Sequence, residues 1–428
     1  MSSAPRRPLV FDLTHLVTRL PTLASTGIDR VDLAYASYYA ADGRMAAGLH
    51  YGLRKPHLYS VEQAREMVRL AAALWSSAGE AHAPDFAAVR DWLASRPGSG
   101  LPRPAQQRKV SGLFGKVRRF HRLRGRLIDN RSIRIPERAI YLNVAQHLFE
   151  FPHFFRWLKR RADLCNVFMI HDLLPLDYPE FFSPSNLGIF RRRLETAFAY
   201  ADAFIVSTEA VRGRLDEELR SRGLSQRPIH VQPFPSPLEG EGRQEKPGAA
   251  GHPYFVTLGT IEPRKNHLLL LHLWRELIRR DPGAPRLALV GARGWENEQI
   301  ADILDRAPAL AAYVIEISGV LSADLVDLLR GARALLMPSF NEGYGLPLVE
   351  ALSLGVPVVA SDIPVFREVT QGRATFVSPL NGEAWLETVS RLNLDQDFAA
   401  GRREEARKFE APTWAGYFRD IDAFLASL

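Results

Sequence analysis

The sequence predicts an α/β fold in which doubly wound parallel sheets form two domains. The chain has 428 residues, more than one ordinary domain contains. Its second half alternates apolar runs of strand length with helical segments, the order that a parallel sheet requires. One of these runs, 334–337, leads into a loop with Gly343 and Gly345 and then an apolar helix. Strand, glycine loop and helix together are typical of an anion-binding site.

Composition places the chain among folded, non-secreted proteins. It is 46% hydrophobic and 24% charged, which is typical of globular proteins and excludes a disordered chain. The single cysteine, Cys165, excludes an internal disulfide, fits a reducing cytoplasm, and lies in an apolar run that predicts a core thiol. We expect no secretory signal and no membrane span. The expected location is cytoplasmic, either free or peripheral on the inner face of the cytoplasmic membrane.

Strands and helices alternate less regularly in the first half. Leu9 to Phe11 is the first expected strand, and Asp12 follows it. Gly27 lies in a turn that opens an amphipathic helix ending near Ala41, and it is either part of a simple helix cap or part of a glycine loop at a ligand site. The other expected strands are 139–144, 166–170, 203–206 and 229–231, and the other expected helices are 61–76, 86–94, 186–200 and 207–221.

A His-Asp pair follows the strand expected at 166–170. His171 and Asp172 stand at the carboxyl end of that strand, where doubly wound folds bind their ligands. An isolated histidine is more often structural than functional. The position at a strand end makes His171 a candidate site residue.

The positive charge of the chain is concentrated in 103–138. This stretch has twelve Lys or Arg against two acidic residues, so it carries +10 while the rest of the chain carries about −3. Apolar residues recur within it every three or four positions, which predicts a basic amphipathic segment. Such a segment fits an anionic membrane surface, although a solvated helix on the protein remains an alternative. Nucleic acid is disfavoured because no recognisable binding fold surrounds the stretch.

A segment rich in proline and glycine, 233–253, is the expected linker between the domains. The strands expected after it are 254–258, 286–290, 314–317, 334–337 and 356–360. A terminal helix is expected at 412–428. Two Asp-x-Asp matches, Asp395 to Asp397 and Asp420 to Asp422, lie in helical segments away from strand ends, and we expect no metal site there.

The glycine loop is flanked by two glutamates. Gly343 and Gly345 allow positive φ and let a ligand approach the backbone, so the N–H groups from Gly343 to Leu346 can face an anion. Glu342 precedes the loop, and Glu350 lies about one helical turn after it. Carboxylates accept hydrogen bonds from the vicinal hydroxyls of a sugar. A phosphorylated sugar compound would therefore use the whole arrangement.

A basic pair follows the first strand of the second half. Gly259 to Asn266 reads Gly-Thr-Ile-Glu-Pro-Arg-Lys-Asn, so Arg264 and Lys265 stand near the start of the next helix. Cations at a helix N-terminus oppose the helix dipole. The pair therefore favours an anionic ligand over a purely structural role.

The string from Pro338 to Glu350, with its Glu-x7-Glu spacing, resembles the donor-site signature of the retaining GT-B glycosyltransferases of family four. The resemblance implies two Rossmann-like domains facing a cleft, with the C-terminal helix crossing back to the first domain. It further implies that Gly259, Arg264 and Lys265 contact the diphosphate of a nucleotide-sugar donor. Thr260 departs from the arginine that many members carry at its position, which leaves Lys265 as the main contact.

The resemblance also assigns roles to other residues. Glu350 would bind the ribose, Glu342 the transferred sugar, and Val320 would pack on the nucleobase. The donor-binding set includes Gly343, Tyr344, Gly345 and Leu346, and the catalytic set is His171, Glu342 and Lys265. Gly27 and Asp172 would lie on the acceptor side. Transfer would retain configuration at the front face and need neither a metal nor a cofactor.

These inferences combine into one prediction. Residues 1–232 form an acceptor-binding domain with the basic insertion 103–138, residues 254–410 form the donor domain, and 411–428 return to the first. The predicted activity is transfer of a hexose from a nucleotide-diphospho-sugar to a glycan or lipid-linked acceptor in bacterial surface polysaccharide or lipopolysaccharide synthesis, with a mannose-like donor favoured. The alternatives are a sugar-nucleotide epimerase of the same fold and a non-enzymatic protein that binds membranes or polyanions.

Overall fold

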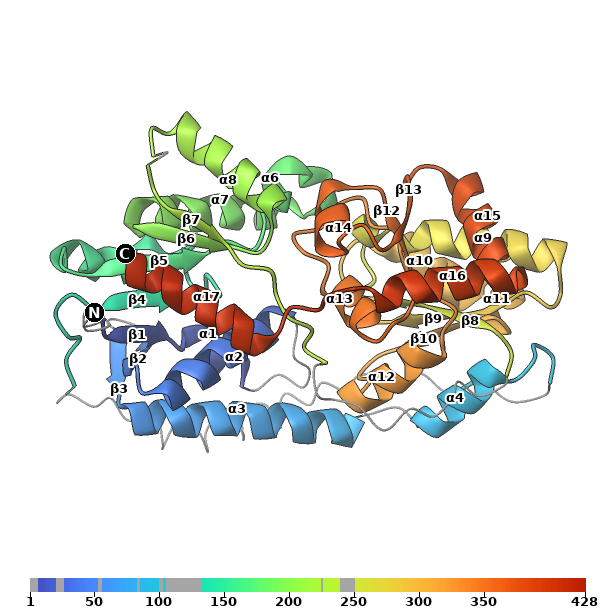
Figure 1. The fold of residues 1–428 in the computed structure, drawn as a ribbon, viewed down its shortest axis with the longest axis horizontal. Helices are drawn as coiled ribbons and strands as arrows, with labels where there is room; N and C mark the ends of the chain where they lie inside the picture. Colours follow the sequence, from blue (N-terminus) through green and yellow to red (C-terminus); the bar gives the residue numbers. More distant parts are fainter. Residues whose placement is uncertain are drawn as a thin grey trace. The chain divides into compact units, whose positions relative to one another are not determined.

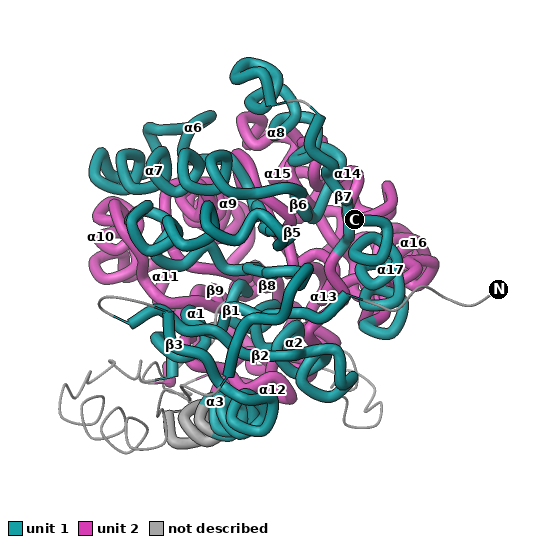
Figure 2. Tube along the Cα trace, turned by 90° about the vertical axis from the view of Figure 1, so that its left-hand side faces the viewer, with its two compact units in different colours: residues 1–78, 109–233, 414–428 teal, residues 79–108, 234–413 magenta. Residues whose placement is uncertain are grey.

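The computed structural model of the chain divides into two compact units (Figures 1 and 2). Unit 1 consists of Met1–Ala78, Lys109–Pro233 and Trp414–Leu428, and unit 2 of Gly79–Arg108 and Phe234–Thr413. The described residues are 7–20, 27–52, 56–82, 85–99, 103–104, 133–224, 226–238 and 251–428. Most of the basic stretch 103–138 and of the expected linker 233–253 lies outside them.

Unit 1 contains a seven-stranded sheet in the order β3-β2-β1-β4-β5-β6-β7. All neighbouring pairs are parallel except β2 and β3, which form an antiparallel edge. The central strands are buried along their whole length, as expected of a sheet covered on both faces. The strands are β1 (Leu9–Asp12), β2 (Met45–Tyr51), β3 (Pro56–Tyr59), β4 (Ile140–Asn143), β5 (Cys165–Met169), β6 (Ala203–Val206) and β7 (Ile229–Val231).

The helices of unit 1 begin at clear sequence signals. Ser183 and Thr208 cap two of them, because their hydroxyls accept hydrogen bonds from the backbone N–H groups of Asn186 and Val211. The α-helices are α1 (Thr14–Arg19), α2 (Gly27–Asp42), α3 (Val61–His82), α6 (Leu174–Asp177), α7 (Pro184–Tyr200), α8 (Glu209–Ser221) and α17 (Trp414–Ser427), and the 3-10 helices are η1 (Pro152–Arg160) and η2 (Pro179–Phe181).

The sequence prediction missed β2 and β3. Strand β2 reads Met-Ala-Ala-Gly-Leu-His-Tyr, and its small residues have low strand propensity. Gly48 is required there by packing, since a Cβ on it would lie 2.4 Å from a methyl group of Leu13. The strand forms because it pairs with β1 and β3, which is a tertiary effect that no local pattern encodes.

The C-terminal helix α17 packs into unit 1, as the fold prediction required. Figure 1 shows it beside α2, and the Tyr35 and Tyr417 hydroxyls lie 2.8 Å apart. Asp422 is buried and accepts hydrogen bonds from Tyr38 at 2.9 Å and Tyr39 at 3.1 Å. It also forms an ion pair with the buried guanidinium of Arg44.

Unit 2 contains a six-stranded, all-parallel sheet in the order β10-β9-β8-β11-β12-β13. The alternation of strands and helices predicted this sheet correctly, although its last strand was missed. The strands are β8 (Tyr254–Leu258), β9 (Arg286–Val290), β10 (Val314–Ile317), β11 (Leu335–Met337), β12 (Val358–Ser361) and β13 (Thr375–Val377).

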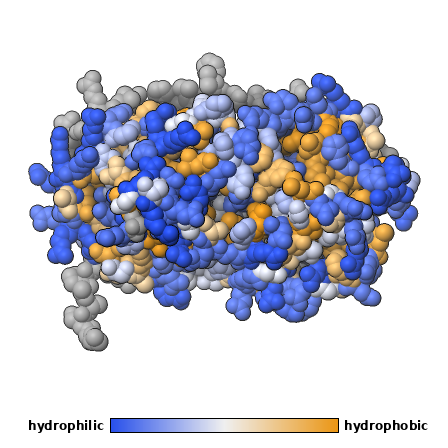
Figure 3. Space-filling model, turned by 90° about the horizontal axis from the view of Figure 1, so that it is seen from above, coloured by the Kyte–Doolittle hydropathy of each residue, from blue (hydrophilic) through white to orange (hydrophobic). Residues whose placement is uncertain are grey.

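The helices of unit 2 cover this sheet, and the largest buried side chains of its core include Trp274 and Trp385. None of the described helices of either unit combines the length and the apolar composition that a bilayer span requires. Hydrophilic residues dominate the face shown in Figure 3, with smaller hydrophobic patches between them. The unit 2 helices are α4 (Phe86–Ala94), α9 (His267–Arg280), α10 (Glu298–Arg306), α11 (Pro308–Ala311), α12 (Ser322–Gly331), α13 (Leu346–Ser353), α14 (Pro364–Val369), α15 (Gly382–Leu394) and α16 (Gln396–Arg407), with the 3-10 helix η3 (Pro263–Lys265).

Helix α4 belongs to unit 2, whereas the sequence prediction placed it in a first domain of residues 1–232. The guanidinium of Arg286, at the start of β9, stacks 3.7 Å from the ring of Trp92 and donates a hydrogen bond to its carbonyl. The backbone N–H of His252 donates to the carbonyl of Ala94 at 2.7 Å. This cation–π pair joins residues far apart in sequence, which is why local patterns did not reveal the boundary.

We expect Asp422→Ala to lower the free energy of unfolding by about 3–5 kcal/mol, because it leaves the charge of Arg44 buried without a partner. Urea unfolding monitored by tryptophan fluorescence measures the change. Asp420→Ala is the matched control on the same helix, since that carboxylate is exposed and paired only with the exposed Arg419. Equal losses in the two variants would contradict the role given to Asp422.

Candidate functional site

The predicted donor residues lie where unit 2 changes its direction of winding. The chain runs outward from β8 through β9 to β10, then returns to add β11 on the other side of β8. Doubly wound sheets bind ligands beyond the carboxyl ends of the strands at this switch point. The loops leaving β8 and β11 carry 259–266 and 338–345 and therefore meet at this edge of the sheet.

Lys265 crosses directly over Gly259. A Cβ on Gly259 would lie 3.1 Å from Cε of Lys265 and 3.2 Å from its Nζ, and the φ of Gly259 is +132°. Both the backbone conformation and the space thus favour glycine at this position. Lys265 belongs to the 3-10 turn η3, and Asn266, in the left-handed region at φ 55°, separates it from α9. The basic pair therefore precedes α9 by one turn and does not open it.

Glu342 bridges both basic side chains. Its Oε1 lies 2.5 Å from Nζ of Lys265, and its Oε2 lies 2.7 Å from Arg264. The hydroxyl of Ser339 donates a second hydrogen bond to Oε1 at 3.0 Å. Arg264 also donates to the backbone carbonyl of Asn341 at 2.6 Å, so side chains and backbone both join the two loops.

The charges of this cluster are strongly coupled. Burial alone would raise the pKa of Glu342, but the nearby charges of Arg264 and Lys265 and their hydrogen bonds outweigh it and lower the pKa to about 2. Burial raises the pKa of Glu262, whose carboxylate accepts a hydrogen bond from Arg264 at 2.6 Å. Burial, aided by the charge of Lys265, lowers the pKa of His267 to about 4. At neutral pH Glu342 is ionised and His267 is neutral.

The glycine loop has one left-handed residue. Gly345 has φ +96°, and a Cβ on it would lie 2.9 Å from the ring of Phe366. Gly343, which the sequence also left free to adopt positive φ, is not among the residues with positive φ. Leu346 begins α13 directly after Gly345. In this loop the backbone conformation therefore requires glycine at Gly345, the residue that precedes α13.

The remaining donor-side residues occupy different environments. Tyr344 is buried, and its hydroxyl donates to the carbonyl of Phe234 at 2.6 Å. Glu350 is 6% exposed within α13. Val320 is half-buried in the loop after β10, next to Gly319, which has φ 75°. Three strands of one sheet edge, β8, β10 and β11, thus lead into the predicted positions.

Sequence reasoning missed several residues that shape this site. A Cβ on Gly291 would lie 1.9 Å from the carbonyl oxygen of Gly259, so the backbones after β8 and β9 touch. A Cβ on Gly294 would lie 2.5 Å from the methyl group of Thr260, so no larger residue fits there. The Gly-x-x-Gly spacing after a buried strand was the available signal. Nothing in the sequence indicated the hydroxyl of Ser339.

The unit 1 candidates lie at the carboxyl edge of their own sheet. His171 follows β5, and its Nε2 lies 2.7 Å from the carbonyl oxygen of Val144, so this nitrogen carries the proton. Burial lowers the pKa of His171 to about 4, which makes the ring neutral at pH 7. Asp172 accepts a hydrogen bond from the N–H of Leu174 at 3.1 Å. Gly27 is exposed as the first residue of α2.

A larger polar cluster at the switch point of unit 1 was not predicted. Asp12, at the end of β1, is buried and accepts hydrogen bonds from Tyr141 at 2.5 Å and Asn143 at 2.6 Å. His15 lies between two fully buried carboxylates, 3.4 Å from Asp29 and 3.2 Å from Asp32. The isolated polar residues Asp12 and His15 after an apolar strand were the only sequence signal.

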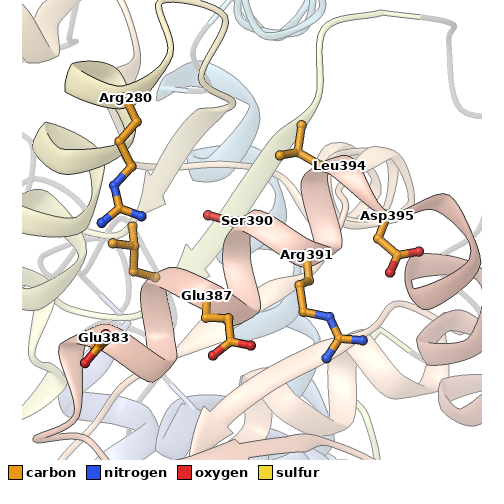
Figure 4. Close-up of a pocket in the computed structure, with 8 residues that line it drawn as sticks. Arg280, Glu383, Glu387, Ser390, Arg391, Leu394 and Asp395 are labelled. Atoms are coloured by element: carbon orange, nitrogen blue, oxygen red, sulfur yellow. The ribbon is translucent and has the colours of Figure 1, made fainter.

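A surface groove of about 500 Å³ lies elsewhere on unit 2 (Figure 4). It contains none of the predicted residues and runs along the outer side of α15. Within the described ranges, no three His, Cys, Asp or Glu side chains gather closely enough to hold a metal ion. The groove is lined by Arg280, Glu383, Leu386, Glu387, Ser390, Arg391, Leu394 and Asp395.

Residues 252–395 match the sequence profile of the family described as glycosyl transferases group 1. The serotype-specific mannosyltransferase WbdA of Escherichia coli is 30% identical over 239 residues, which cover 53% of this chain and 29% of WbdA. O-antigen chain mannosyltransferase B of Escherichia coli is 34% identical over 35% of this chain and 39% of its own length. A D-inositol 3-phosphate glycosyltransferase of Saccharomonospora viridis is 31% identical over 39% of this chain and 40% of its own length. The chain thus spans less than half the length of these relatives.

Solved structures match nearly the whole chain. Sucrose-phosphate synthase from Thermosynechococcus elongatus superimposes with a TM-score of 0.60 at 14% identity, over 99% of each chain. The UDP-forming α,α-trehalose-phosphate synthase of Burkholderia vietnamiensis gives a TM-score of 0.57 at 12% identity, over 100% of each chain. These matches and the two Rossmann-like units confirm the predicted GT-B fold.

We expect the contribution of Glu342 to stability to vanish in acid. Because its folded pKa of about 2 lies below the ordinary 4.5, the stabilisation is present above pH 4.5 and is lost as the pH falls towards 2. The full effect is on the order of 3 kcal/mol. The difference in unfolding free energy between the wild type and Glu342→Gln should therefore shrink from pH 6 to pH 3.

Glu276→Gln is the control for this titration. The pKa of Glu276 is also lowered, by hydrogen bonds from Arg279 and Arg280, but this cluster is exposed and screened by solvent. Its substitution should change stability little at any pH. A wild-type advantage over Glu342→Gln that stays constant down to pH 3 would contradict the buried ion pair.

Proposed function

We propose that the chain is a glycosyltransferase that takes a hexose from a nucleotide-diphospho-sugar, because residues 252–395 match the family described as glycosyl transferases group 1. The observation that carries the proposal is the pairing of Arg264 and Lys265 with Glu342 at the switch point of unit 2. Two cations held beside a glycine loop and the N-terminus of α13 suit a diphosphate. Gly259 provides the space in which Lys265 lies.

The donor has to compete with Glu342 for these cations. In the structure, the Glu342 carboxylate accepts a hydrogen bond from the ammonium group of Lys265, as a phosphate oxygen would in the complex with the donor. We propose that the diphosphate replaces this carboxylate at Lys265, so that the buried cations exchange one anion for another. Glu342 then becomes available to accept hydrogen bonds from the hydroxyls of the transferred sugar. Glu350 is assigned to the ribose and Val320 to the nucleobase.

The proposed chemistry retains the configuration of the sugar. The bond between the anomeric carbon and the diphosphate oxygen breaks, and its electron pair leaves with the diphosphate. The acceptor hydroxyl bonds to the anomeric carbon from the same face, and its proton passes to an oxygen of the leaving phosphate. Lys265 and the N–H groups around Gly345 stabilise the charge that develops on the diphosphate. No step requires a metal or a cofactor.

The acceptor is assigned to unit 1. Its candidates are His171, Asp172 and Gly27, at the carboxyl edge of the sheet or the start of α2. The neutral ring of His171 can contact sugar hydroxyls without introducing a charge. The mannosyltransferase relatives favour a growing bacterial surface glycan as acceptor and a mannose-like donor. A lipid-linked form of that glycan would bring the protein to the inner face of the cytoplasmic membrane.

The direct test is transfer of labelled mannose from its nucleoside diphosphate donor to a mannose-containing oligosaccharide or lipid-linked acceptor. We expect a product that forms without added divalent metal and persists in chelator, with the linkage in the configuration of the donor. Donor epimerisation without transfer would instead support an epimerase. A full screen of nucleotide-sugars that gives neither transfer nor epimerisation would overturn the proposed activity.

Donor binding should separate the roles of three residues. Lys265→Ala should lower the affinity for a bare nucleoside diphosphate by roughly ten- to a hundred-fold, because a charged hydrogen bond contributes about 1.5–3 kcal/mol. Glu350→Gln should weaken binding of the same nucleotide by removing a ribose contact. Glu342→Gln should bind it at least as tightly as the wild type, because the competing carboxylate is gone, yet transfer should fall. Isothermal titration calorimetry measures the affinities.

Glu383→Gln serves as the control, since this glutamate lies on the surface groove of α15 and should leave the affinity unchanged. If Glu342→Gln weakens the bare nucleotide as much as Glu350→Gln does, the proposed exchange at Lys265 is wrong. If Lys265→Ala leaves affinity unchanged, the diphosphate lies elsewhere.

A further inference from the structure

The 3-10 helix η1 presents a basic stripe on the surface of unit 1. A 3-10 helix has three residues per turn, so side chains three positions apart lie on one face. His153, Arg156 and Lys159 share such a face, and all three are exposed. Phe155 and Leu158 share another face and are buried in the core of the unit. The core thus fixes the orientation of η1 and turns its cations towards solvent.

Further exposed cations lie at the end of η1 and on the helix packed against it. Arg160 is exposed at the end of η1, and Arg191 and Arg192 are exposed on α7, which packs against η1. Among the residues that the structure describes, no carboxylate forms an ion pair with any of these cations. We call the group the basic patch, and its members are Arg156, Lys159, Arg160, Arg191 and Arg192.

The carboxylates around the basic patch are already engaged by other arginines. Glu150 pairs with Arg193 at 2.9 Å, and Asp163 pairs with Arg161 at 2.8 Å. The first of these pairs joins the segment before η1 to α7, and the second lies in the segment just after η1. The outer cations therefore keep their charge uncompensated, which suits an extended anionic surface better than a single small anion.

An exposed aromatic side chain borders the patch. Phe151 immediately precedes η1 and is 45% exposed. Its ring lies 6.1 Å from the rings of both His153 and Phe154. Pro152 beside it is also exposed. An apolar tip next to uncompensated cations is the combination that favours the interface of an anionic bilayer.

The C-terminal end of η1, opposite to Phe151, anchors the chain that leaves the basic stretch 103–138. Arg161 donates hydrogen bonds to the carbonyls of Ile135 at 3.2 Å and Pro136 at 2.8 Å. The backbone N–H of Arg138 donates to the carboxylate of Asp163 at 3.0 Å. The sequence with the greatest excess of positive charge therefore enters the fold beside the basic patch.

We propose that the basic patch and Phe151 form a membrane-contact surface that binds anionic phospholipid headgroups. The patch supplies charge complementarity to the bilayer surface, and Phe151 supplies apolar burial at its interface. This inference deepens the proposed function, on which it rests for the use of a lipid-linked acceptor. It assigns the contact to η1 and α7 of unit 1, in addition to the basic stretch itself.

The test is co-sedimentation of the full chain with vesicles of phosphatidylglycerol and phosphatidylcholine at low salt. The triple variant Arg156→Ser, Arg160→Ser and Arg192→Ser should lower the partition coefficient by about a hundred-fold, at roughly five-fold per cation. Phe151→Ser should lower it separately. High salt should release the wild type, and vesicles of phosphatidylcholine alone should not bind it.

Two controls isolate the surface from net charge. Replacing Arg275, Arg279 and Arg306 of unit 2 with serine removes the same charge elsewhere, and Leu380→Ser removes an exposed apolar side chain that is 83% accessible. Both should bind vesicles like the wild type. Hydrogen–deuterium exchange of the wild type adds a measurement without substitution, and vesicles should protect the amides of η1.

The inference is overturned if the triple variant binds vesicles like the wild type, if the unit 2 control loses as much, or if η1 gains no protection. Binding to double-stranded DNA without binding to vesicles would also overturn it. Transfer to a soluble acceptor should be unchanged in the triple variant. If the wild type itself shows no transfer to any acceptor, the proposed activity is refuted, but the vesicle result still stands.

Discussion

The candidate site of unit 2 depends on the ion pairs that Glu342 makes with Arg264 and Lys265. A buried carboxylate or ammonium is costly unless an opposite charge and hydrogen bonds compensate it. Here Glu342 pairs with both cations of the other loop, Glu262 also pairs with Arg264, and Ser339 donates a hydrogen bond to Glu342. The loops after β8 and β11 are thereby fixed against each other. An anion that enters must compensate the charge of these cations as fully as Glu342 does.

The two units apply the same topological rule with different chemistry. In unit 2 the switch point lies between β8 and β11 and holds a buried Lys–Arg–Glu cluster. In unit 1 it lies between β1 and β4, where Asp12 is bound by Tyr141 and Asn143. The histidines near that edge, His147 and His171, have their pKa values lowered to about 4 by burial and are neutral. The first arrangement suits phosphate, and the second suits uncharged hydroxyls.

Unit 1 also shows how burial and charge are divided on one short element. Phe155 and Leu158 fix η1 to the core, whereas Arg156 and Lys159 between them are exposed. The three-residue repeat of a 3-10 helix makes this separation sharper than an α-helix would over the same length. A short element can thus present cations to solvent without loss of core packing.

The resemblance to the GT-B glycosyltransferases implied that the terminal helix returns to the first domain. The sequence alone determined the α/β class, the parallel sheet of unit 2, and the loops that hold Lys265 and Gly345. These features follow from local periodicity, glycine placement and a long motif, all of which are written in neighbouring residues. Only the tertiary structure decided that Glu342 engages Lys265, 77 positions away, and that α4 joins unit 2 through Trp92 and Arg286. It also decided which of the two loop glycines takes positive φ. Such pairings depend on which strands become neighbours, and no local pattern specifies that.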